Sequence, residues 1–130
     1  MKELTRIVLT VSLIASAFVF AEELAMAQDP VKVDPKHYKI EFENDQVRVL
    51  RITYGPHEKS VMHDHPAGQV VYLTDAHVKF GLPGGKSEEQ SGKAGQTGWA
   101  PAGKHLPENV TDKRLEAILV ELKTKPAKAK

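Results

Sequence analysis

Two histidines that lie two residues apart form the pattern with the clearest chemical meaning in this sequence. His63 and His65 flank Asp64, and the segment 66–68 that follows is a Pro/Gly turn. Side chains two apart on an extended strand point to the same face, so a strand here would present both imidazoles to one point. Imidazole nitrogens are common ligands of divalent transition metals. The spacing therefore predicts half of a metal site on a strand.

The segment after this turn offers one more polar atom. Gln69 opens a second apolar run that continues through Val71 and Leu73. If Gln69 faces the imidazoles, Val71 and Leu73 face the same way, because the side-chain period of a strand is two. The sequence thus predicts that the amide oxygen of Gln69 lies on the ligand face.

A second Gly/Pro-rich segment, residues 95–109, carries a further histidine, His105. Two Gly/Pro-flanked strands, the first with His-x-His and the second with a single His, resemble the two motifs of the cupin superfamily. The residues that lie on the cupin pattern are His63, His65, Gln69, Gly95, Pro101, Gly103, His105 and Asn109.

Some positions depart from the cupin pattern. His57 stands where the first motif begins with Gly, Gln69 replaces the Glu, and Ala76 replaces the closing Gly. The gap from Gly103 to His105 is one residue short. The departures leave two motifs in the right order, and the flanking segments extend the resemblance over most of the chain after residue 27.

The resemblance implies a jelly-roll-like barrel with a divalent transition metal in its pocket, held by His63, His65, His105 and, weakly, Gln69. Neutral imidazoles suit Fe, Mn, Ni, Cu or Zn, and the sequence does not choose among them. Similar cupins act as dioxygenases or isomerases on small molecules, the metal polarising an oxygen of the substrate. Because Gln69 adds no negative charge, the implied site would favour an anionic ligand.

Two other functions stay open beside a metal-dependent enzyme. One is a non-catalytic module that binds a small ligand or a metal, and the other is a degenerate barrel with an interaction role. The candidate catalytic residues are His57 and Glu58, which lie near the expected pocket mouth, with Glu108 as a further carboxylate. We expect the remaining polar and aromatic residues near the motifs to have structural roles. His37 and His77 should lie on the surface, Asn109 in a turn, and Tyr54 and Trp99 in the core or the pocket wall.

Short alternating segments dominate the sequence after residue 36. Tyr38, Ile40 and Phe42 alternate with charged residues, which is typical of a half-buried strand. Residues 113–122 could form a closing strand or a helix, and the β-branched pair Ile118 and Val120 favours the strand. About eight to ten such strands, separated by turns and without a helix after residue 27, predict an all-β sandwich or barrel.

The first 27 residues have the composition of a secretory signal peptide. Lys2 and Arg6 precede an apolar run over 7–21, and Ala25-Met26-Ala27 fits the small-x-small cleavage rule. We expect cleavage after Ala27 and a periplasmic or secreted protein without a stable membrane anchor. An uncleaved anchor is the alternative, although the run is shorter than the roughly 20 residues that a spanning helix needs.

The expected domains are a signal peptide (1–27), a polar lead-in (28–36), a barrel (37–123) and a basic disordered tail (124–130). The chain has no Cys, which excludes disulfides, thiol catalysis and Cys ligands. Its 18 basic and 17 acidic residues nearly balance, so the charge indicates no nucleic-acid partner. The expected partner is a small molecule, and a homodimer is plausible for so small a core.

Overall fold

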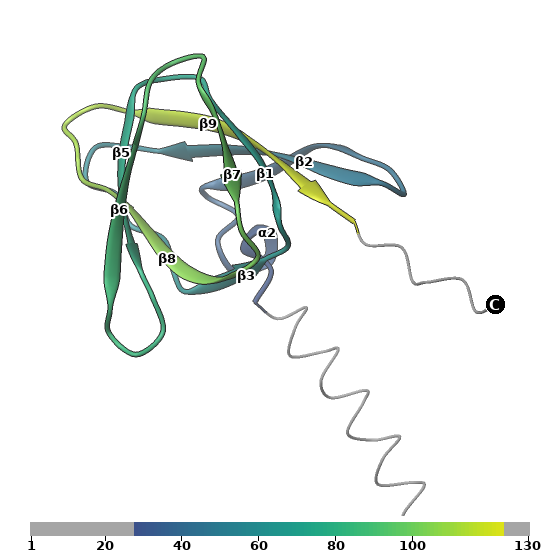
Figure 1. Ribbon diagram of the computed structural model, residues 1–130, viewed down its shortest axis with the longest axis horizontal. Helices are drawn as coiled ribbons and strands as arrows, with labels where there is room; N and C mark the ends of the chain where they lie inside the picture. Colours follow the sequence, from purple (N-terminus) through teal and green to yellow (C-terminus); the bar gives the residue numbers. More distant parts are fainter. Residues whose placement is uncertain (1–27, 124–130) are drawn as a thin grey trace, which may run out of the picture.

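Residues 28–123 are described by a computed structural model of the chain, and within them nine strands form two antiparallel sheets (Figure 1). The five-stranded sheet has the order β1-β2-β9-β4-β7, and the four-stranded sheet has the order β3-β8-β5-β6. The strands are β1 (Tyr38–Glu43), β2 (Val47–Tyr54), β3 (His63–His65), β4 (Gly68–Tyr72), β5 (Ala76–Gly81), β6 (Ser87–Gly92), β7 (Thr97–Ala100), β8 (Gly103–Asn109) and β9 (Leu115–Leu122). The expected signal peptide and basic tail lie outside these residues.

Most neighbouring strands are far apart in the sequence. The last strand, β9, lies between β2 and β4, and β3 pairs with β8, although the paired residues are about forty positions apart in the chain. These long-range antiparallel pairings join the two halves of the chain into one jelly-roll-like body (Figure 1). The all-β prediction is therefore confirmed, and residues 115–122 form a strand and no helix.

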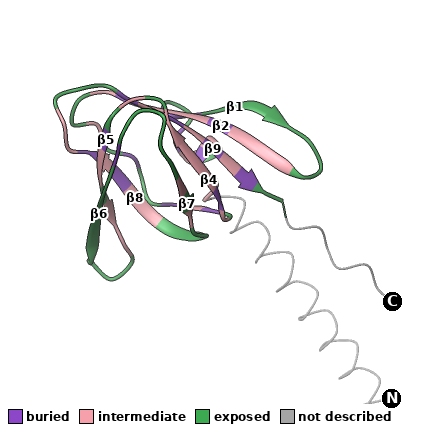
Figure 2. Cartoon of the chain, turned by 45° about the horizontal axis from the view of Figure 1, so that its top comes forward, coloured by how far each residue is buried: buried purple, intermediate pink, exposed green. Residues whose placement is uncertain are grey.

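The core lies between the sheets and is built by alternation along β2 and β9. Leu50 is fully buried in β2, and Leu115, Ala117 and Leu119 are buried in β9. Residues two apart share one face, so each strand turns every second side chain inward. Figure 2 shows the alternation along β9 as buried segments between intermediate ones. Burial of these side chains supplies the hydrophobic stabilisation of the fold.

The first strand departs from the expected alternation. Tyr38 is buried, but Ile40 is 45% exposed and Phe42 is 53% exposed. β1 is an edge strand, and its register with β2 shifts between Ile40 and Phe42, which interrupts the period of two. The prediction of a half-buried strand is therefore right for Tyr38 and wrong for the two residues that follow.

The lead-in segment holds a short helix that the sequence did not predict. α2 (Pro30–Val33) begins after Asp29, whose side chain accepts a hydrogen bond of 2.9 Å from the Val31 N–H as a helix cap. Pro30 is buried, and the Gln28 carbonyl accepts from the Asp64 N–H at 3.0 Å. The segment is thus part of the folded body. Among residues 28–123, no helix is long and apolar enough to cross a membrane.

Candidate metal and ligand site

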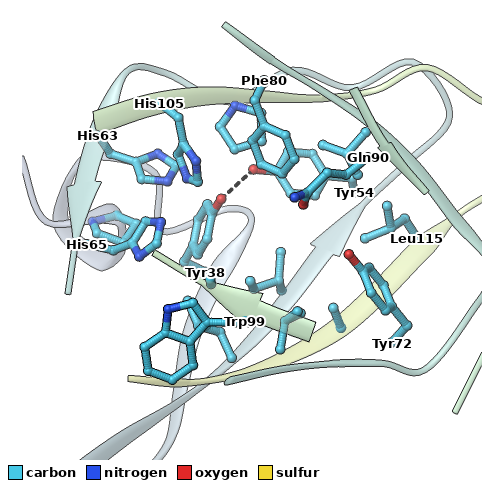
Figure 3. Close-up of a pocket in the computed structure, with 18 residues that line it drawn as sticks. Tyr38, Tyr54, His63, His65, Tyr72, Phe80, Gln90, Trp99, His105 and Leu115 are labelled. Atoms are coloured by element: carbon cyan, nitrogen blue, oxygen red, sulfur yellow. Dashed lines mark hydrogen bonds between the residues drawn. The ribbon is translucent and has the colours of Figure 1, made fainter. Parts of the chain in front are cut away.

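The pairing of β3 with β8 brings the three candidate ligand histidines together. His63 lies directly opposite His105, and His65 lies opposite Gly103. The ring centroid of His105 is 4.9 Å from that of His63 and 4.6 Å from that of His65. The His63 and His65 rings are 6.3 Å apart. Figure 3 shows the three rings gathered at one end of a pocket.

Backbone carbonyls fix the tautomers of the two β3 histidines. The Nδ1–H of His63 donates to the Val61 carbonyl at 2.9 Å, and the Nδ1–H of His65 donates to the Pro66 carbonyl at 2.8 Å. Because a carbonyl oxygen only accepts, Nδ1 must carry the proton in both rings. In a neutral ring this leaves the lone pair on Nε2. His63 Nε2 is buried and has no hydrogen-bond partner within residues 28–123.

Burial lowers the pKa of His63 and of His105. Desolvation lowers the pKa of His63, and a charge on His65 would lower it further. Desolvation lowers the pKa of His105 to about 3, with smaller contributions from His65 and His63. A neutral imidazole is the form that binds a metal, because a protonated nitrogen has no lone pair to donate.

The three rings do not form a closed ligand set in their present positions. Within residues 28–123, no group of three or more His, Cys, Asp or Glu side chains is arranged to hold a metal ion. The His63 and His105 rings are nearly perpendicular, at 88°. His105 also stacks on Phe80, with centroids 4.9 Å apart and an interplanar angle of 26°. The site is therefore a cluster of neutral donors.

The structure corrects the orientation predicted for Gln69. Val70 and Tyr72 line the pocket, whereas Gln69 does not. Val70 pairs with Leu119, which is buried in the core, and Gln69 pairs with Val120 on the opposite face. The first cupin motif allows three or four residues between His-x-His and its acid, and the longer spacing ends at Val70. An apolar side chain thus occupies the position of the expected fourth ligand.

Neither candidate catalytic residue lies in the pocket. His57 is at the surface, where its Nε2–H donates to Asp112 at 2.6 Å and its backbone has a φ of 55°. Glu58 accepts from Lys36, from the Gly55 N–H and from His37.

These hydrogen bonds, from Lys36 first and then from the Gly55 N–H and His37, lower the pKa of Glu58 to about 2. A carboxylate with so low a pKa is a poor proton acceptor near neutral pH. Glu108, the third candidate, is outside the pocket too, while its neighbour Pro107 lines it.

His37 was expected at the surface and is buried instead, at 5% exposure. Its Nδ1–H donates to Asp34 at 2.7 Å, and its Nε2–H donates to Glu58 at 2.9 Å. Its ring stacks on Tyr54, with centroids 4.4 Å apart and an angle of 10°. His37 therefore joins the lead-in segment to the loop before β3. The feature of the sequence that could have indicated this burial is the spacing of Asp34 and His37, which lie three residues apart on either side of Pro35.

Asp34 also connects this network to the site. The Ser60 hydroxyl donates to Asp34 at 2.5 Å and lies 3.4 Å from His63 Nδ1. Asp34, His37 and Ser60 are all buried, so the polar groups satisfy one another away from water. The network holds the loop that leads into β3.

The pocket itself has a volume of about 100 Å³ and is lined mainly by apolar side chains. Tyr54 forms part of the wall, and Trp99 lies at the mouth with 56% exposure, in line with their predicted roles. Asn109 donates to the Gly55 and Lys113 carbonyls at 2.9 and 2.7 Å, which confirms its structural role. His77 lies outside the pocket and contacts Glu89.

Solved structures with the same fold include a cupin domain from Bordetella pertussis Tohama I. It is 22% identical, with a TM-score of 0.62, and the match covers 67% of this chain and 92% of that chain. An RmlC-like cupin family protein with a double-stranded β-helix fold from Methanocaldococcus jannaschii is 18% identical over 68% of this chain and 83% of that chain, with a TM-score of 0.52. The polyketide cyclase RemF from Streptomyces resistomycificus is 16% identical over 68% and 66%, with a TM-score of 0.50.

No protein-family model matches the sequence, and no curated protein matches it. At these identities the structural likeness establishes the fold. The chain has the cupin fold, the double-stranded β-helix, as its two motifs predicted.

Proposed function

We propose that this cupin-fold protein binds a divalent transition metal through His63, His65 and His105 and holds a small molecule beside it. The observation that carries the proposal is the Nε2 atom of His63, which is buried without a partner in residues 28–123. Leaving a buried polar atom unpaired costs about 1–3 kcal/mol. A metal ion at this nitrogen would remove that cost.

The donor set fits a metal. The Nδ1–H groups of His63 and His65 are bound to backbone carbonyls, an arrangement that orients a ligand imidazole and raises its basicity. His105, the least buried of the three, lies opposite His63. When bound, the metal would supply a Lewis acid that polarises an oxygen atom of the ligand.

Binding, rather than base-assisted turnover, is the function that the pocket supports best. Among residues 28–123 no Asp or Glu lines the pocket, and the candidate bases His57 and Glu58 are engaged with other residues outside it. The dioxygenase or isomerase activity implied by similar cupins would have to use a histidine, a tyrosine or the ligand itself for proton transfer. RemF, described as a polyketide cyclase, has the same fold, so the fold itself accommodates small-molecule chemistry.

The test is the metal content of the purified protein, measured by elemental mass spectrometry after loading and desalting. His63→Ala, His65→Ala and His105→Ala should each lower the occupancy at least fivefold. His77→Ala is the matched control, because His77 is a strand histidine that contacts Glu89 outside the pocket, and it should retain the parental occupancy. Parental occupancy in all three ligand variants would refute the proposed site.

A further inference from the structure

The pocket that contains the histidine cluster has no formal charge in its lining. Its eighteen lining residues include no Asp, Glu, Lys or Arg. Val78, Phe80 and Leu119 are among the aliphatic and aromatic side chains that form the walls. An ionised ligand inside the protein without an opposite charge would lose its hydration at a high free-energy cost. The walls therefore select against an ion unless a metal neutralises it.

Two tyrosine hydroxyls supply a polar anchor in this apolar wall. The hydroxyls of Tyr38 and Tyr54 are 2.7 Å apart, and both residues are 3% exposed. Desolvation raises the pKa of both phenols, so both keep their protons. One proton makes the mutual hydrogen bond, and the second can be donated to the neighbouring Ser60 hydroxyl or to a ligand oxygen that takes its place.

The anchor lies beside the histidines. The Tyr38 ring meets the His63 ring edge to face, with centroids 4.9 Å apart and an angle of 72°. Figure 3 shows the hydroxyl pair between the histidine cluster and the rest of the pocket. An oxygen bound to the pair would therefore lie at the histidine end, with the apolar part of the ligand along the walls.

The size of the pocket limits the ligand to about one ring. A dry apolar cavity of about 150 Å³ is known to hold one benzene molecule. The volume here is about 100 Å³, with Trp99 at an open mouth into which part of a ligand can extend. A bicyclic or longer molecule would exceed this space.

From these observations we infer that the pocket binds a compact, uncharged, mainly apolar molecule of one ring with a single hydroxyl or carbonyl oxygen, anchored by Tyr38 and Tyr54. This inference rests on the proposed function, which selects the pocket, and it names the class of ligand that the pocket binds. It differs from the anionic ligand that the sequence suggested, because that expectation needs the charge of a bound metal, whereas the residues that line the pocket carry no charge of their own.

The experiment uses the purified, EDTA-treated protein and three probes that share one ring: phenol, benzene and benzoate. Affinities come from calorimetry or ligand-observed NMR. Phenol should bind about fivefold more tightly than benzene, the effect of one hydrogen bond. Benzoate should bind at least tenfold more weakly than phenol, because no cation in the pocket offsets its charge. Benzoate binding as tightly as phenol, or no phenol binding, would overturn the inference.

Single-atom variants locate the anchor. Tyr54→Phe keeps the ring that stacks on His37 and removes one hydroxyl, so it should reduce the phenol preference over benzene to below twofold. Tyr38→Phe serves the same purpose if Tyr54→Phe does not fold. Tyr72→Phe removes a hydroxyl at the other end of the pocket from the histidines and should change phenol affinity by less than twofold (Figure 3). An equal loss in Tyr72→Phe would contradict the assignment of the anchor.

The metal content of the same preparations separates the two claims. Protein that binds metal but shows no preference for phenol would refute the ligand class and leave the metal site standing. Protein that prefers phenol in a Tyr54-dependent manner but takes up no metal would support the ligand class and refute the metal site.

Discussion

His63 and His105 face each other directly across the β3–β8 pair, and their rings meet edge to face at 4.9 Å. This cross-strand pair joins residues 42 positions apart in the chain and places one buried, unpaired nitrogen beside a second neutral imidazole. The pair defines the end of the pocket at which a metal would bind.

The absence of a carboxylate at this end leads to a prediction about residue 70. Val70→Glu should place an acid on the pocket face and raise Zn²⁺ affinity at least tenfold, because a carboxylate adds a charged oxygen ligand to three neutral nitrogens. Gln69→Glu should change the affinity less than twofold, since Gln69 lies on the other face of β4. Competition against a chromophoric chelator measures both. The reverse order of effects would mean that Gln69, and not Val70, points to the metal.

Acid should destabilise the metal-free protein through His105. The pKa of His105 is about 3 in the folded protein, below its usual value of 6.5. Below pH 6.5 the unfolded chain therefore binds a proton at residue 105 that the folded chain does not bind. The contribution of the neutral His105 to the free energy of unfolding is thus fully present above pH 6.5 and is lost as the pH falls toward 3. At about 1.4 kcal/mol per pH unit, the loss between pH 6.5 and pH 5 is at most about 2 kcal/mol.

Urea unfolding at pH 7, 6 and 5 after EDTA treatment measures this loss. The range stays above the usual pKa values of carboxylates, so their titration contributes little. His105→Gln removes the titrating group and should flatten the pH dependence. A slope that is unchanged in this variant would assign the acid sensitivity to another group.

The buried network around His37 should matter for folding. His37→Phe retains a ring to stack on Tyr54 but removes the hydrogen bonds to Asp34 and Glu58, which leaves the Ser60 hydroxyl as the side-chain partner of the buried Asp34. Leaving a buried polar group without one of its hydrogen bonds typically costs about 1–3 kcal/mol. His77→Phe breaks an exposed contact with Glu89 and should cost no more than about 1 kcal/mol. Urea denaturation at pH 7 compares the two, and similar costs would show that the His37 network contributes no more than a surface pair.

Export should remove the first 27 residues. The small-x-small sequence before Gln28 predicts a mature chain that starts at Gln28 or its cyclised form. Intact-mass measurement of secreted or periplasmic protein gives the result. A full-length mass in the cytosol would contradict export.

Much of the fold could be predicted from local patterns. For residues 113–122 the β-branched pair Ile118 and Val120 favoured a strand over a helix, and the structure has a strand over Leu115–Leu122. The period of two along a strand placed His63 and His65 on one face, and the two motifs together predicted the cupin fold. These predictions held because each depends on residues only a few positions apart.

The pairing of distant strands decided which side chains face the pocket, and short-range patterns could not decide this. The sequence analysis predicted Gln69 on the inner face, but the choice between Gln69 and its neighbour Val70 depends on how β4 pairs with β9, where a shift of one residue exchanges the two faces. His37 looked like a surface residue because its carboxylate partner Glu58 comes 21 positions later and meets it only in the folded chain. The sequence by itself therefore determined the strands, the fold and the three histidines. The tertiary structure decided which side chain faces the pocket and which charges are buried together, because both depend on contacts between segments that no short-range pattern records.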